Sequence, residues 1–311
     1  MNSALRALLN SYLEADSMDQ AEQLRNIIKN QTPPKRPTAR VITVTSGKGG
    51  VGKSNVSINL AVQLRKMGQR VIIFDADFGL ANIEVMFGAV PKHNLSDLIY
   101  QGKNIREIIT MGPMDIGFIS GGSGIAGLSN LGREYINYLI QNLAELDMLA
   151  DVIIIDTGAG ISDAVIEFLV ASGEVLLVTT PEPTSITDSY SLLKALNRNP
   201  RFNRDITQIK VVTNKVSNYE EGRQLFTKLN AVVSRYLKIP ISFVGVIPDD
   251  PLLLKAVMQQ TPISIENPNA KSSMAFKDLA TTLVNGGNDP VFRKYGMAGF
   301  FANIVRGNTR H

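Results

Sequence analysis

Residues 46–54 read SGKGGVGKS, and this stretch decides how we interpret the rest of the 311-residue chain. The β-branched run VITVT precedes it at 41–45, and NVSINLA at 55–61 carries apolar residues at helical spacing. We therefore expect a strand, a glycine loop and a helix in succession. Glycines let successive backbone N–H groups point into one hollow, and the start of the helix adds positive potential. The sequence thus predicts a phosphate-binding loop.

The side chains of this loop add chemistry to the backbone hollow. Residues 47–54 match the pattern G-x-x-x-x-G-K-[ST], in which the lysine, here Lys53, reaches the β- and γ-phosphates and the hydroxyl, here Ser54, ligates magnesium. The alternative, a chance glycine turn, is disfavoured by a match at every position between strand and helix. The predicted ATP-contacting residues of the loop are Gly47, Lys48, Gly49, Gly50, Val51, Gly52, Lys53, Ser54 and Asn55.

A second lysine, Lys48, lies five residues before Lys53. The arrangement K-G-G-x-G-K resembles the deviant phosphate loop of the MinD/ParA ATPases. That resemblance implies that Lys48 reaches the nucleotide of a partner subunit, so that ATP bridges two copies in a homodimer. The alternative is that Lys48 is a solvated loop charge.

Composition limits the remaining possibilities. With 44% hydrophobic and 19% charged residues, the chain can form one large α/β domain with appendages, or two modest domains. A net charge of +4 without a dense basic cluster does not indicate nucleic-acid binding. The absence of cysteine excludes disulfides and thiolate metal sites. Since no apolar run approaches the ~18 residues of a spanning helix, we expect a cytoplasmic protein that associates reversibly with the inner membrane face.

The N-terminal region is predicted to be helical and tethered. Leu5, Leu8 and Leu9 begin an apolar stripe over 3–15, a second helix begins near Ser17, and the prolines of 31–37 end it. The predicted domains are a helical activator segment (1–30), a Pro-rich linker (31–40), an ATPase domain (41–286) and a C-terminal membrane-targeting helix (287–311).

The second of these helices contains DQAEQLR at 19–25, which resembles the D-Q-A-x-x-L-R helix of the flagellar MinD-type ATPase FlhG. In that family the helix docks on the GTPase FlhF, so the resemblance makes Gln20 the activating residue. It implies partner contacts by Asp19, Gln20, Leu24 and Arg25. The family motif usually opens the chain, which leaves residues 1–17 as an extension; the alternative is an ordinary frayed terminus.

From residue 40 onward, short apolar runs alternate with amphipathic stretches. This alternation predicts a mostly parallel, twisted sheet with helices on both faces, the α/β fold of the MinD/ParA-like P-loop NTPases. Ligands collect at the carboxyl edge of such a sheet. The strand candidates are 41–45, 70–74, 116–120, 152–155, 175–179, 209–213 and 243–247.

Two strand ends carry carboxylates. DADFGLAN at 75–82 resembles the MinD and FlhG branch rather than the D-P-Q of ParA proteins, which implies that Asp77 positions the hydrolytic water. We expect Asp75 to support the magnesium shell or the loop; the alternative for the two carboxylates is a solvated turn. VIIIDTGAG at 152–160 resembles the Walker B and switch II elements. Asp156 suits the second shell of magnesium, and Gly158 and Gly160 let the backbone respond to the γ-phosphate.

The base pocket is predicted from VVTNKVS at 211–217. Guanine-specific GTPases read N-K-x-D here, and Ser217 replaces the aspartate, so we expect adenine beside Asn214 and Pro248. The segment 182–188, EPTSITD, also matches the family as the start of a helix beside the nucleotide, with simple helix capping as the alternative.

The C-terminal tail carries an apolar stripe that includes Phe300, Phe301, Ile304 and Val305, with Arg293 and Arg306 at its margins. Such a stripe normally packs in a core. A terminal, aromatic stripe with basic margins also fits an interfacial helix on anionic lipid. MinD and FlhG end in such a helix, so we favour membrane binding.

Taken together, the sequence resembles an FlhG-type ATPase that controls flagellar number and placement. The implied activity is slow, magnesium-dependent ATP hydrolysis with Lys48, Lys53 and Asp77 as catalytic residues. The implied partners are FlhF, proteins of the flagellar switch complex (C-ring) and the membrane. The alternatives are a MinD-like division-site selector, a ParA-like DNA-positioning ATPase and a non-enzymatic scaffold.

Overall fold

The computed structural model describes residues 38–77, 82–122, 133–286 and 296–306. The residues from Thr38 onward belong to one compact unit. The proposed activator helix with Asp19, Gln20, Leu24 and Arg25, and the proline run of the linker, lie outside the described residues.

The described residues form one eight-stranded sheet, in the order β3-β4-β2-β5-β1-β6-β7-β8. All neighbouring strands run parallel except β3 and β4. This confirms the predicted fold class. The strands are β1 (Arg40–Ser46), β2 (Val71–Ala76), β3 (Thr110–Met111), β4 (Gly117–Ser120), β5 (Val152–Ala159), β6 (Glu174–Thr179), β7 (Gln208–Val216) and β8 (Ile241–Pro248).

The continuous apolar runs form the centre of the sheet because strands covered on both faces need no polar side. Every residue of β2 and of β6 is buried. All seven predicted strands are confirmed. The sequence analysis missed β3, whose two residues pair antiparallel with β4, because two residues carry no periodic pattern.

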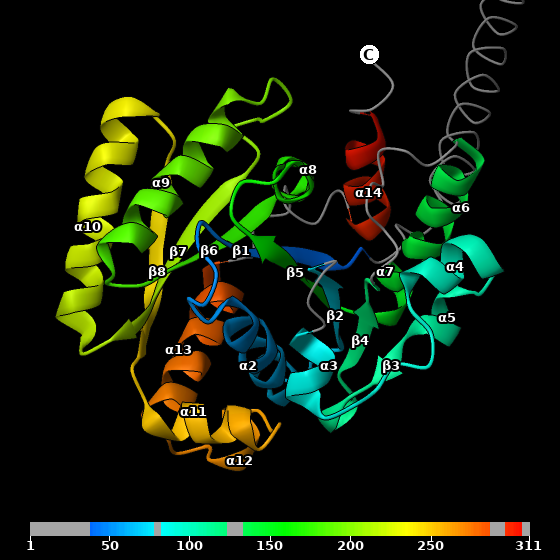
Figure 1. Ribbon diagram of the computed structural model, residues 1–311, viewed down its shortest axis with the longest axis horizontal. Helices are drawn as coiled ribbons and strands as arrows, with labels where there is room; N and C mark the ends of the chain where they lie inside the picture. Colours follow the sequence, from blue (N-terminus) through cyan, green and yellow to red (C-terminus); the bar gives the residue numbers. More distant parts are fainter. Residues whose placement is uncertain (1–37, 78–81, 123–132, 287–295, 307–311) are drawn as a thin grey trace, which may run out of the picture. The chain divides into compact units, whose positions relative to one another are not determined.

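Helices cover both faces of the sheet, as Figure 1 shows. One face packs against α2 and α13, and the other against α8, α9, α10 and α14. The helices are α2 (Lys53–Lys66), α3 (Asn82–Phe87), α4 (Leu95–Gln101), α5 (Ile105–Ile108), η1 (Pro113–Asp115), α6 (Arg133–Ala144), α7 (Leu146–Leu149), α8 (Asp163–Ala171), α9 (Pro183–Arg198), α10 (Tyr219–Tyr236), α11 (Pro251–Met258), α12 (Ile263–Glu266), α13 (Lys271–Gly286) and α14 (Gly296–Arg306). Within the described residues, no helix is long and apolar enough to cross a membrane.

The C-terminal helix α14 packs its apolar stripe against the rest of the domain. Met297, Phe300, Phe301 and Ile304 are at most 4% exposed and belong to the core cluster beneath α6 and α8. The Phe301 ring meets Phe74 of β2 edge-on at 5.9 Å, and Phe300 stacks on Phe168 of α8 at 5.8 Å. The side chain of Val305 lies outside the described part.

The sequence left open whether this helix packs on its own domain, and in the structure Phe300, Phe301 and Ile304 do so; their contact with a membrane stays a prediction. In this conformation the stripe completes the core instead of facing lipid, because β2 and α8 offer it aromatic partners. The helical pattern itself is confirmed. Any exposure of the stripe to a membrane requires α14 to leave this position.

We expect Phe301→Ala to lower the free energy of unfolding by roughly 3–5 kcal/mol, the usual cost of truncating a buried phenylalanine. Urea denaturation of the full chain measures this change. Met258→Ala is the control, because Met258 is 79% exposed and its truncation should change stability by less than ~0.5 kcal/mol. Equal, small effects of both substitutions would show that α14 is not part of the folded core.

Candidate functional site

A cavity of about 740 Å³ opens at the carboxyl edge of the sheet. Its lining brings together most of the loop, the second aspartate of the D-x-D segment and both predicted base-pocket residues. The predicted residues that line it are Gly49, Gly50, Gly52, Lys53, Ser54, Asn55, Asp77, Asn214 and Pro248. Asp156 lies below the cavity, where it contacts two of these residues.

The glycine loop between β1 and α2 is held by its neighbours. Gly52 precedes α2 with φ of 90°, a left-handed conformation that favours glycine. A Cβ at this position would lie 2.4 Å from Asn214 Nδ2. The Asn214 amide donates to the Val51 carbonyl at 2.7 Å, and Lys215 Nζ donates to the Gly50 carbonyl at 2.8 Å. The end of β7 thus fixes the shape of the loop.

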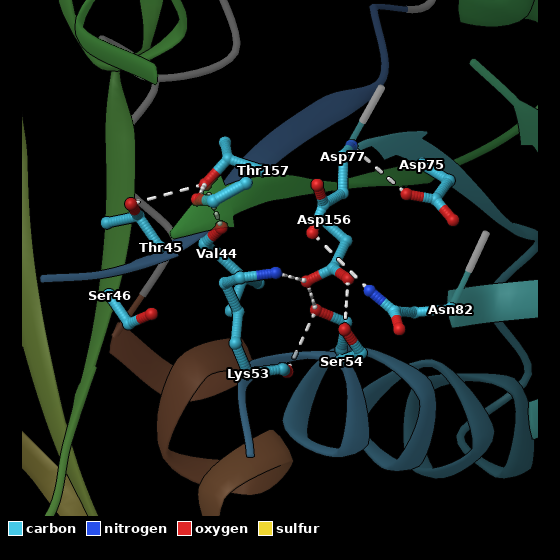
Figure 2. A network of polar contacts seen from close by, with 12 residues as sticks. Val44, Thr45, Ser46, Lys53, Ser54, Asp75, Asp77, Asn82, Asp156 and Thr157 are labelled. Atoms are coloured by element: carbon cyan, nitrogen blue, oxygen red, sulfur yellow. Dashed lines mark hydrogen bonds and ion pairs between the residues drawn. The ribbon is translucent and has the colours of Figure 1, made fainter. Parts of the chain in front are cut away.

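Asp156, at the end of β5, is the charged centre beneath the loop. Its side chain is fully buried, and Lys53 Nζ lies 3.2 Å from its Oδ1. Ser54 Oγ donates to its Oδ2 at 2.6 Å, as seen in Figure 2. Ser57, one turn further along α2, donates to Oδ1 at 2.8 Å. A buried carboxylate needs such partners because desolvation otherwise disfavours its charge.

Asp75 lies beside Asp156 on the neighbouring strand, because these two residues are in register between β2 and β5. Its carboxyl group accepts the backbone N–H groups of Asp77 and Ile83. Burial, and then repulsion from Asp156, raise the pKa of Asp75 to about 7. A divalent cation would relieve that repulsion. Together with the Ser54 hydroxyl, the two carboxylates supply the hard oxygen atoms that magnesium prefers, so the residues fit this ion.

Asp77 projects from the end of β2 into the cavity lining. Asn82 Nδ2 donates to its Oδ2 at 3.4 Å, and burial raises the pKa of this carboxyl. A Cβ on Gly158 would lie 3.5 Å from Asp77 Oδ1, so the two switch segments approach each other closely. Gly160 N–H donates to the Ser46 carbonyl, which ties the second switch to the strand before the loop.

The structure separates the two lysines of the loop. Lys53 is 6% exposed and faces Asp156, whereas Lys48 is outside the cavity lining and 36% exposed. Lys48 Nζ forms an ion pair with Glu182 and donates to Thr184 Oγ1 at 3.0 Å, both at the start of α9. The hydrogen bond from Lys48 lowers the pKa of Glu182. Glu182 makes no side-chain capping bond, so its role here is the lysine contact.

Several residues of the cavity escaped the sequence analysis. Asn82, Met86, Lys215, Leu253, Leu254 and Val257 line it in addition to the predicted set. The apolar members come from α3 and α11, which no motif links to the loop. Lys215 follows Asn214 directly, and its positive φ of 57° is rare outside glycine. Asn214 Oδ1 is buried without a hydrogen-bond partner in the described part of the chain, so an acceptor remains open at the predicted base pocket.

A glycine loop at a helix start, a lysine over a buried aspartate and a parallel sheet together define a nucleotide-binding protein of the P-loop NTPase class. The ParA family model, described as NUBPL iron-transfer P-loop NTPase, matches residues 38–284.

Two relatives from bacteria narrow this class. The antiactivator FleN of Pseudomonas aeruginosa is 43% identical over 241 residues, which cover 78% of this chain and 85% of that protein. The flagellum site-determining protein YlxH of Helicobacter pylori is 32% identical over 296 residues, covering 93% and 98% of the two chains. The chain therefore belongs to the ParA family of P-loop ATPases and, within it, to the FlhG group of MinD-type proteins.

Solved structures support the same fold. The septum site-determining protein MinD of Pyrococcus horikoshii, complexed with Mg-ADP, aligns with a TM-score of 0.63 at 23% identity and covers 80% of this chain and 98% of its own. A ParA family ATPase from Chlorobium tepidum aligns with the same score at 19% identity, over 79% and 98% of the two chains.

The paired carboxylates predict a specific pH dependence without magnesium or nucleotide. An unfolded chain loses the Asp75 proton near pH 4, whereas the folded protein keeps it until about pH 7. The free energy of unfolding should therefore fall as the pH rises through this window, by at most on the order of 4 kcal/mol. Asp75→Asn should abolish this decrease in urea titrations between pH 4.5 and 8.

Asp278→Asn, an exposed change on α13, is the control and should keep the wild-type dependence. A wild-type slope in Asp75→Asn would show that Asp75 does not carry the effect.

Proposed function

We propose that this protein is an ATP-dependent switch that controls the number and placement of flagella. The name of YlxH, a flagellum site-determining protein, supports the flagellar role. The observation that carries the switch is the separation of the two loop lysines: Lys53 lines the cavity of its own chain, and Lys48 contacts Glu182 outside that cavity. A part-exposed cation outside the cavity of its own chain can reach a second subunit once it leaves Glu182.

In the proposed mechanism, each of the described side chains has a separate role in ATP hydrolysis. The loop N–H groups and Lys53 hold the phosphates, and their positive charge offsets the charge that develops on the transferred group. Asp77, kept in place by Asn82, orients the attacking water. Ser54, with Asp75 and Asp156 behind it, would hold magnesium, which supplies further charge neutralisation at the phosphates. Asn214 Oδ1 is placed to accept from the amino group of adenine.

Dimerisation through Lys48 has a direct test. In an Asp77→Ala background that blocks hydrolysis, we expect the protein to be dimeric with ATP in light scattering. Adding Lys48→Ala should make it monomeric while fluorescent ATP still binds within about threefold of its original affinity, because Lys48 does not line its own cavity. Lys215→Ala is the matched control for Lys48→Ala. Because Lys215 lines the cavity and holds the Gly50 carbonyl, its removal should weaken nucleotide binding itself, which Lys48→Ala should not do. A dimer that survives Lys48→Ala would contradict the bridging role.

Membrane association is proposed through release of α14, whose apolar stripe then inserts into anionic headgroups. We expect ATP-bound protein to float with vesicles containing phosphatidylglycerol and ADP-bound protein to remain unbound. Phe301→Glu should abolish flotation in preparations that still bind ATP. Met258→Glu, which alters an exposed apolar residue on α11, should not. Flotation of folded Phe301→Glu at the wild-type level would exclude α14 as the anchor.

Stimulation of FlhF is proposed from the DQAEQLR helix alone. A glutamine can both donate and accept hydrogen bonds while it orients a water molecule. We expect a peptide of residues 18–30 to increase GTP hydrolysis by FlhF at least tenfold and the Gln20→Ala peptide to have no effect. A Gln23→Ala peptide is the control and should keep full stimulation. No stimulation by the unsubstituted peptide would remove this part of the proposal.

A further inference from the structure

Ser57 is a buried hydroxyl at the site that no phosphate-loop motif includes. It lies one turn into α2, is fully buried, and donates to Asp156 Oδ1 at 2.8 Å. Its oxygen is also 3.3 Å from the Lys53 carbonyl, so the shorter contact to the carboxylate takes the proton.

The partners of Asp156 divide between its two oxygens. Oδ2 accepts from Ser54, and Oδ1 accepts from Lys53 and Ser57. Ser54 can ligate magnesium with a lone pair and still donate its proton to Oδ2. Lys53, however, turns to phosphate when nucleotide binds. Ser57 is then the described partner that remains on Oδ1.

We infer that Ser57 is a positioning residue for magnesium: it keeps the Asp156 carboxylate from rotating once Lys53 has moved to the nucleotide. A carboxylate that keeps a hydrogen bond on each oxygen stays aimed at the metal site. Loss of such supporting bonds typically weakens metal binding 10- to 100-fold. The inference rests on the magnesium-nucleotide binding proposed above.

The test measures magnesium and nucleotide binding separately, with fluorescent mant-ADP as the probe on the full chain. Ser57→Ala should raise about tenfold the magnesium concentration that gives half of the magnesium effect on mant-ADP binding. Its mant-ADP affinity in EDTA should stay within about twofold of wild type, and Ser57→Thr, which keeps the hydroxyl, should restore the magnesium response.

Ser273→Ala is the matched control, because Ser273 is equally buried but its hydroxyl contacts the carbonyls of Ile263 and Asn267. It should leave the magnesium response unchanged. Wild-type magnesium dependence in Ser57→Ala, or a parallel loss of affinity in EDTA, would overturn the positioning role. Failure of wild-type protein to bind mant-ADP at all would instead overturn the proposed function.

A separate observation concerns the two ends of the compact unit. Asp147, in α7, is 8% exposed, and its Oδ1 accepts the N–H of Met297 at 2.7 Å and the N–H of Ala39 at 3.2 Å. Met297 lies in the first turn of α14, and Ala39 immediately precedes β1. One carboxylate therefore binds the start of the C-terminal helix and the point where residues 1–37 join the domain.

The contact is close and electrostatically favourable. Gly296 has φ of 48°, and a Cβ there would lie 2.3 Å from Asp147 Oδ2. A negative charge at a helix N-terminus is stabilised by the helix dipole. At the other end of α14, Arg201 donates to the Asn303 carbonyl at 3.2 Å. When α14 leaves, water gains access to Asp147 and competes for the N–H of Ala39.

We infer that Asp147 couples the two ends of the compact unit, so that release of α14 loosens the N-terminal junction at Ala39. The biological consequence rests on the proposed release of α14 to a membrane, and the physical coupling is testable without lipid. Through this carboxylate, departure of the C-terminal helix would loosen the backbone at Ala39, directly after residues 1–37.

Hydrogen exchange of the full chain provides the test. Asp147→Ala should accelerate amide exchange at least tenfold in both 38–41 and 296–304, with β8 unchanged. Asp250→Ala is the matched control, because Asp250 is also buried and accepts two backbone N–H groups, from Leu252 and Ser272. It should loosen α11 without affecting Ala39 or α14.

Acceleration at only one end in Asp147→Ala, or at neither, would overturn the coupling. A coupling that is present while vesicle flotation fails would leave this inference intact and remove only its membrane consequence.

Discussion

The structure depends on a carboxylate buried in the centre of a parallel sheet. Asp156 is completely removed from solvent, and such a charge is stable only where cations and hydroxyl groups surround it. Lys53, Ser54 and Ser57 all come from the first two turns of α2, so the helix must start directly above β5. The start of α2 is thereby held over β5 by contacts that include the two residues proposed to bind phosphate and metal, Lys53 and Ser54.

This arrangement links binding to a rearrangement of partners. Lys53 forms an ion pair with Asp156, and in the proposed function the same lysine binds the phosphates. The second carboxyl group of the site, Asp75, has a raised pKa because it is buried beside Asp156. The ionised form of Asp75 is therefore disfavoured beside Asp156, and a magnesium ion would favour it. In the proposed complex, magnesium would offset the charge of the two carboxylates, and the phosphates would offset the charge of Lys53.

The outer parts of the molecule bear on how the switch communicates. Lys48 is held by Glu182 at the start of α9, away from the cavity, and α14 is held in the core by aromatic contacts and by Asp147. Each of these contacts must break before the proposed partner, a second subunit or a membrane, can be engaged. In this conformation, the contacts that stabilise the protein use the same side chains that the proposed active form presents to its partners.

The sequence by itself determined the phosphate loop, the seven longer strands and the carboxylates at their ends, because these follow from local patterns and from the rule that parallel strands share one carboxyl edge. It also identified the family through the loop and the D-x-D segment. Tertiary structure alone decided that the stripe on α14 packs on Phe74 and Phe168, that Lys48 pairs with Glu182, and that Asp147 joins Ala39 to Met297. An amphipathic pattern specifies that a face is buried, but the surface that buries it is set by residues more than 100 positions away.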